Sequence, residues 1–215
     1  MINIIYEDNH LLVVEKPINI PVQKDSSNDL DLLTMLKDYI KRKYNKPGNV
    51  YLGLVHRLDR PVGGVMVFAK TSKAASRLSE QIRNGTFKKG YLATICGKVK
   101  ENGTLEDYLL KDTKTNMVKI DKKGKKSILN YKRLNYKEGM SLVEIELITG
   151  RSHQIRVQFS SRGYPLYGDQ RYNKTAKVGE QIALFSNSIT FEHPISKKKI
   201  EFNLELPKRR PWNIF

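Results

Sequence analysis

Residues 54–70 read Leu54-Val55-His56-Arg57-Leu58-Asp59-Arg60-Pro61-Val62-Gly63-Gly64-Val65-Met66-Val67-Phe68-Ala69-Lys70. One carboxylate, Asp59, stands between two arginines, and a Val-Gly-Gly turn and an apolar strand follow it. An unpaired carboxylate out of water is very costly, so an acid in this place needs a cation. Arg57 and Arg60 could supply that cation and keep Asp59 ionised, as nucleophilic work on a polyanion requires. The alternative explanation is a structural salt bridge at the end of a strand.

The whole stretch resembles the signature of the RluA-like family of RNA pseudouridine synthases. That signature is His-Arg-Leu-Asp, a short polar spacer, a glycine and an apolar run that ends in Ala-Lys, here His56 to Lys70. The resemblance implies that Asp59 is the nucleophile that isomerises a flipped uridine in RNA, and that Arg57 fills the vacated space. It implies no cofactor and no metal. The chain departs from the family at Val62, where many members carry a threonine, so a local hydrogen bond is expected to be missing.

Two further segments match the same family in the expected order, and they supply the other predicted site residues. Residues 87–93 resemble its Lys-x-Tyr-x-Ala strand, which implies that Tyr91 stacks on the target base and acts as acid or base. Residues 149–158 resemble its Thr-Gly-Arg-x-His-Gln-hydrophobe-Arg pattern, which implies that Arg156 pairs with the catalytic Asp59. The resemblance extends from about residue 3 to residue 206, and it includes Lys16-Pro17 and a loop at 163–172.

The second segment also has an interpretation of its own. A helix is expected to open near Ser152, and free N–H groups at a helix start suit a phosphate. Arg151 and His153 lie at that end, and with Arg57 and Arg60 they are the predicted RNA-binding residues. Ordinary capping and packing explain Arg151 and His153 equally well.

Composition agrees with a polyanionic partner. The 215 residues carry a net charge of +17 and a sequence pI near 9.8, which favours binding of RNA. No run of about 18 apolar residues is present, so no membrane span is expected. The N-terminus lacks the pattern of a signal peptide, and the lone Cys96 fits a reducing compartment, so the cytoplasm is the expected location. The four histidines are far apart and lack cysteine partners, which argues against a zinc site.

The pattern of elements predicts the α+β class and one catalytic domain over residues 1–215. We expect a mixed, largely antiparallel twisted sheet flanked by helices and loops, with a central RNA-binding cleft. A hairpin is predicted at 2–14, with Glu7 to His10 as its turn. Helices are predicted from Asn28, as N-cap, to about Tyr44 and from about Ser72 to Asn84. Strands are predicted near 90–97, 104–110, 116–120, 127–134 and 141–149, and Glu144 and Glu146 on the last one are expected to face solvent.

Two rival functions fit part of the evidence. A non-catalytic basic RNA-binding protein explains the charge but not the carboxylate among the arginines. A glycosidase-like hydrolase normally needs two flanking carboxylates, and the motif holds one. Because the hairpin begins at residue 2, we expect a catalytic domain without an S4 domain. Its choice of a site in rRNA or tRNA is then expected to come from three basic segments, namely 41–46, 122–126 and 208–210. The sequence does not reveal the oligomeric state, and a monomer is the default expectation.

Overall fold

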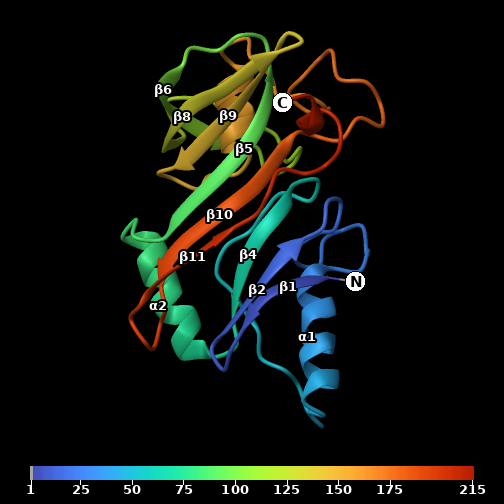
Figure 1. Ribbon diagram of the computed structural model, residues 1–215, viewed down its shortest axis with the longest axis vertical. Coiled ribbons are helices and arrows are strands. Elements are labelled where there is room, and N and C mark those ends of the chain that lie inside the picture. Colours follow the sequence, from blue (N-terminus) through green and yellow to red (C-terminus); the bar gives the residue numbers. More distant parts are fainter. Residues whose placement is uncertain (1) are drawn as a thin grey trace. The chain divides into compact units, whose positions relative to one another are not determined.

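The computed structural model describes residues 2–215, and these fall into two compact units. The first unit is Met1–Phe87 with Ser188–Leu204, and the second is Lys88–Asn187 with Glu205–Phe215. Both units combine strands with short helices, which confirms the predicted α+β class (Figure 1). Among residues 2–215, no helix has both the length and the apolar character needed to cross a membrane.

The first unit is built on a predicted and confirmed hairpin. Strands β1 (Asn3–Glu7) and β2 (Leu11–Lys16) pair antiparallel, and β2 also pairs antiparallel with β4 (Gly63–Ala69). The short β3 (Gly53–Leu54) pairs with β4, and β11 (Lys199–Asn203) pairs with β10 (Leu184–Glu192). The strand order of this part is β1-β2-β4-β10. The core side chains include Leu11, Val13, Val65, Val67, Ile189 and Phe191.

Two helices accompany these strands, and one begins later than predicted. Helix α2 (Ser72–Arg83) starts at the Thr71 cap and stops before Gly85, whose φ of 71° suits glycine, as predicted. Helix α1 (Leu32–Lys43) is capped by Asp31, which accepts a hydrogen bond from the Thr34 N–H, so the prediction of Asn28 as N-cap is wrong. Asn28 has a left-handed φ of 59° and lies in the loop before the helix.

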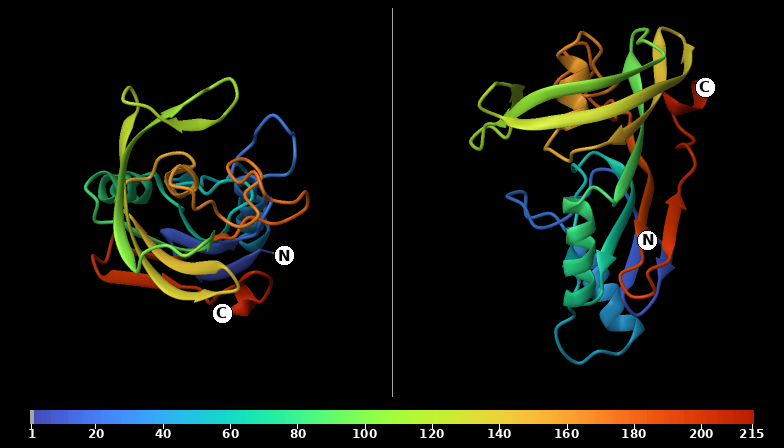
Figure 2. Two further views of the ribbon diagram at one scale, coloured as in Figure 1. Left: turned by 90° about the horizontal axis from the view of Figure 1, so that it is seen from above. Right: turned by 90° about the vertical axis from the view of Figure 1, so that its left-hand side faces the viewer.

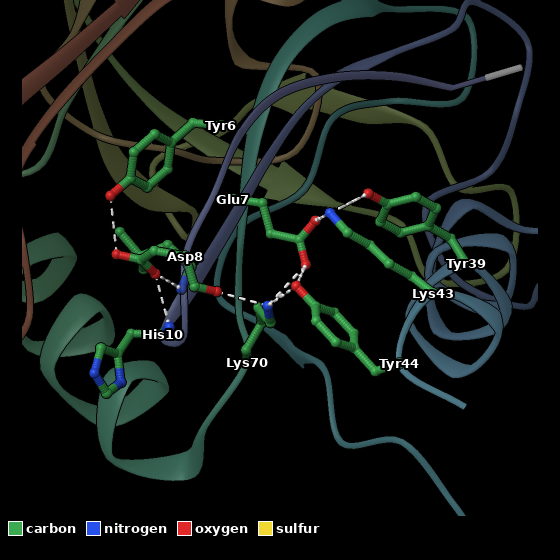
Figure 3. Close-up of polar contacts among 9 residues, drawn as sticks. Tyr6, Glu7, Asp8, His10, Tyr39, Lys43, Tyr44 and Lys70 are labelled. Atoms are coloured by element: carbon green, nitrogen blue, oxygen red, sulfur yellow. Dashed lines mark hydrogen bonds and ion pairs between the residues drawn. The ribbon is translucent and has the colours of Figure 1, made fainter. Parts of the chain in front are cut away.

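A buried carboxylate joins α1 to the hairpin and to the end of β4. Glu7 accepts hydrogen bonds from Lys43 Nζ (2.7 Å) and Lys70 Nζ (2.8 Å), and from the hydroxyls of Tyr39 and Tyr44 (Figure 3). Its side chain is 6% exposed. Burial opposes ionisation, but these four donors together lower the pKa of Glu7 to about 2. The Glu7 carboxylate therefore links the β1–β2 hairpin to α1 and to the end of β4.

The second unit is an antiparallel meander with one helix of seven residues. Its strands are β5 (Lys88–Cys96), β6 (Asn102–Lys111), β7 (Val118–Ile120), β8 (Lys125–Lys137) and β9 (Met140–Leu147), in the order β5-β9-β8-β6-β7. Helix α3 is Gln154–Ser160, and a short 3-10 helix is Trp212–Ile214. These strands confirm the five predicted ones, and Glu144 and Glu146 are exposed as expected.

Strands β6 and β8 form a long ribbon that carries the lysine-rich residues 122–126 at its tip (Figure 2). Gly124 lies so close to β6 that an added Cβ would stand 2.3 Å from the carbonyl carbon of Leu109. Only glycine allows the backbone at position 124 to lie this close to β6, so this contact fixes the position of the tip against β6.

Candidate functional site

Asp59 lies on a turn between β3 and β4. The turn is closed by a hydrogen bond of 2.9 Å from the Val62 N–H to the Asp59 carbonyl. Leu58 is buried next to Asp59, and Asp59 itself is half-buried. Burial of Leu58 and the hydrogen bond from Val62 fix the backbone at this point, while Asp59 stays partly exposed.

Lys16 anchors this turn from the end of β2. Its ammonium donates three hydrogen bonds, to the carbonyls of Pro17 (2.9 Å), Arg60 (2.9 Å) and Val62 (2.8 Å). Burial lowers the pKa of Lys16 to about 7, while the nearby Asp59 carboxylate raises it. Lys16 therefore both fixes the turn and places positive charge near the predicted nucleophile. The sequence showed Lys16-Pro17 as a family element but gave it no role.

The Val62-Gly63-Gly64 departure has a structural explanation. A Cβ on Gly63 would stand 3.2 Å from the carbonyl oxygen of Lys16, and Gly64, paired with Lys16 in the sheet, has a φ of 123°. Val62 is 2% exposed and uses both of its backbone polar groups in the turn. The apolar side chain thus contributes burial at the position where the family resemblance implies a threonine.

The two arginines beside Asp59 differ in their surroundings. Arg60 donates to the Asn19 carbonyl (3.2 Å) and the Ser27 hydroxyl (3.0 Å), and its guanidinium pairs with Asp29. It therefore holds the irregular loop before α1, in which Asn19 has a left-handed φ of 63°. Arg57 is exposed, and its side chain has no hydrogen-bond partner within residues 2–215. Their roles toward RNA stay predictions.

His56 of the motif has a structural contact. Its Nε2 accepts a hydrogen bond of 3.1 Å from the Val67 N–H of β4, so that nitrogen carries no proton. Its ring lies 5.5 Å, between centroids, from the ring of Phe87. His56 thus supports the strand that follows the Asp59 turn.

In the second unit, Tyr91 lies on β5 and Arg156 on α3. Tyr91 is 6% exposed and stands opposite Ile145 of β9. Arg156 is 4% exposed and makes a bidentate ion pair with Asp169, with Nε–Oδ2 and Nη2–Oδ1 distances of 2.9 Å and 2.7 Å. Its guanidinium also lies 5.2 Å from the centroid of the Tyr172 ring. Such a fork fixes both the charge and the orientation of Arg156.

Asp169 was not among the predicted site residues. It lies in the 163–172 loop, which resembles a segment of the family in sequence and for which no site residue is predicted. The pairing of Asp59 with Arg156 joins residues of the two units and stays a prediction.

His153 and Arg151 lie just before α3, which begins at Gln154 and so two residues later than Ser152. His153 has a left-handed φ of 50°, and its Nδ1 lies 2.8 Å from the Tyr172 hydroxyl. That hydroxyl accepts from the Val118 N–H, so its proton is available for Nδ1. Arg151 is exposed and donates to the carbonyl of Lys126 at the ribbon tip (3.2 Å). Hydrogen bonds within the second unit therefore orient both side chains, the His153 ring and the Arg151 guanidinium.

The described residues include no group of three or more His, Cys, Asp or Glu side chains that could hold a metal ion. Cys96 is half-buried, and burial raises the pKa of its thiol.

The comparisons with known proteins agree with one another. The family model described as RNA pseudouridylate synthase matches residues 10–161. Ribosomal large subunit pseudouridine synthase D of Zymomonas mobilis is 32% identical, with 96% of this chain and 70% of that protein covered. The uncharacterized RNA pseudouridine synthase YhcT of Bacillus subtilis is 34% identical, with 96% and 69% covered. About three tenths of each relative has no counterpart in this chain.

A solved structure, human RNA pseudouridylate synthase domain containing 4, matches with a TM-score of 0.81 and 21% identity, over 96% of this chain and 89% of that one. At this identity the likeness shows the fold. The sequence matches show more, since the family model spans well over half of the residues and includes Asp59, Tyr91 and Arg156. This chain belongs to the RNA pseudouridylate synthase family.

Proposed function

We propose that this chain converts specific uridines of RNA to pseudouridine, with ribosomal RNA of the large subunit as the first candidate substrate and tRNA as the second. The observation that carries the proposal is the family match over residues 10–161, which includes all three residues predicted to be catalytic. The large-subunit choice is supported by the relative from Zymomonas mobilis, which is named a ribosomal large subunit pseudouridine synthase.

In the proposed reaction the target uridine leaves its stack and Asp59 initiates cleavage of the C1′–N1 bond. The uracil rotates, C5 bonds to C1′, the C5 proton passes to solvent and N1 takes up a proton. Substrate and product are isomers, so the balance requires no oxidant and no energy source. Lys16 supports this role of Asp59, because its three hydrogen bonds fix the turn on which Asp59 lies.

We further propose that residues 1–215 act as one catalytic domain, since the family match includes residues of both units. Salt-sensitive contacts from lysines and arginines to phosphates supply the affinity. The proposed setting is the cytoplasm, and the proposed state is a monomer, which sedimentation of the purified protein tests.

The experiment is tritium release from large-subunit rRNA transcribed with uridine tritiated at C5. Wild-type protein releases tritium, whereas Asp59→Asn releases none and binds the transcript within about threefold of wild type. Asp38→Asn is the matched control, because Asp38 is exposed on α1. Binding without release from rRNA or tRNA would favour the non-catalytic RNA-binding alternative.

A further inference from the structure

Lys89 lies on the face of β5 that also carries the buried Tyr91, Ala93 and Ile95. Side chains alternate along a strand, so Lys89 shares its face with Tyr91, which stands opposite the buried Ile145. Its neighbour Lys88 lies on the other face, where it is exposed and forms an ion pair with Glu146 at 3.4 Å. The two adjacent lysines therefore have opposite surroundings.

The Lys89 ammonium lies beside the Thr149–Arg151 segment. A Cβ built on Gly150 would stand 2.9 Å from Lys89 Nζ, and no other atom outside the adjacent residues comes within 4 Å of that position. Lys89 is half-buried, and burial lowers the pKa of its ammonium. Within residues 2–215, no hydrogen-bond acceptor or acidic side chain partners it.

Removing an ammonium from water without a hydrogen-bond or ion-pair partner costs free energy. An anion of a ligand that binds beside Lys89 would offset this cost. The side chain keeps partial exposure, which leaves a ligand a path to it. The nearby Arg151 is also exposed, and the chain carries a net charge of +17, so the surroundings favour an anion over a cation.

We propose that Lys89 binds a phosphate of the RNA strand that carries the target uridine. The proposal rests on the proposed function and adds a binding residue to it. Tyr91, on the same strand face, is the residue proposed to stack on the base. A phosphate held by Lys89 would therefore fix the backbone close to the nucleotide that reacts.

The test compares Lys89→Met with the matched control Lys88→Met in the tritium-release assay at several salt concentrations. For Lys89→Met we expect KM to rise about tenfold with kcat within about threefold, as for loss of one charged hydrogen bond in binding. The slope of log(kcat/KM) against log[salt] should become shallower by about 0.7, the value for one phosphate contact with a single strand. Lys88→Met should match wild type in KM.

A second variant moves the ammonium without removing its charge. Gly150→Ala places a methyl group against Lys89 Nζ, the mobile end of a flexible side chain, so the fold tolerates the change. KM should rise as for Lys89→Met, and the double variant should add no further effect.

The outcomes separate the two proposals. If wild type releases no tritium from any RNA, the proposed function fails. If wild type is active but Lys89→Met matches Lys88→Met in KM and salt slope, the phosphate contact alone is overturned. A lower melting temperature of Lys89→Met with unchanged KM would likewise overturn it, in favour of a structural role.

Discussion

Replacement of Glu7 by glutamine should reveal how strongly one buried anion stabilises the first unit. The four donors around Glu7 lower its pKa from 4.5 to about 2. A shift of about 2.5 units at about 1.36 kcal/mol per unit corresponds to roughly 3 kcal/mol. Lys43 is 44% exposed, and solvent weakens its contribution, so we expect Glu7→Gln to lose about 2 kcal/mol at pH 7.

The sign follows from the lowered pKa. The stabilisation is fully present above the unfolded pKa of Glu7, near 4.5, and is lost as pH falls through the folded pKa of about 2. The difference between wild type and Glu7→Gln should therefore be constant from pH 7 to pH 5 and shrink between pH 4.5 and pH 2.

Urea denaturation followed by circular dichroism measures both quantities. Glu80→Gln is the control, because Glu80 is exposed on α2 and its carboxylate has no ion-pair partner within residues 2–215. A loss below about 0.5 kcal/mol at pH 7, or a difference that persists at pH 2, would refute the assigned role of Glu7.

Three further outcomes test the site and its supports. Lys16→Met removes the donor from three carbonyls of the Asp59 turn, so kcat for tritium release should fall at least about tenfold at saturating RNA; an unchanged kcat would show that the turn needs no anchor. Asp169→Asn removes the bidentate ion pair of the buried Arg156 and should lower the free energy of unfolding by about 3 kcal/mol in urea denaturation, whereas a loss below about 1 kcal/mol would contradict a strong pair. Gly124→Ala forces main chain apart and should cost about 1–3 kcal/mol in the same assay, while Gly48→Ala, with open space around it, should cost little.

Local patterns predicted most of the elements, because their signals lie within a few residues. The 72–84 helix has an apolar face and a terminal glycine, and the structure confirms the helix and its stop before Gly85. From Val143 to Leu147 of β9, apolar and acidic residues alternate, and the apolar ones are buried while the glutamates are exposed. These features depend on neighbours in the chain, which a sequence displays.

The misses arise from partners far apart in the sequence. Asn28 looks like a helix cap, but Arg60 binds the adjacent Asp29 and keeps that segment in the loop, so Asp31 becomes the cap. The hydrophilic residues around Glu7 predict a turn. Nothing local shows that side chains at the end of α1, Tyr39, Lys43 and Tyr44, will enclose the Glu7 carboxylate. For the site, the motifs named Arg156, but its Asp169 partner could be found only once the 163–172 loop was placed.

The division of the chain also bears on the order in which the protein can fold during synthesis. The core of the first unit combines Leu11, Val13 and Val65 with Ile189 and Phe191. Residues 88–187 of the other unit are made in between. A nascent chain therefore cannot complete the core of the first unit until β10 has left the ribosome. Until then, the apolar side chains of β2 and β4 lack their contacts with Ile189 and Phe191. Loss of the last thirty or so residues would damage the part of the protein that is synthesised first.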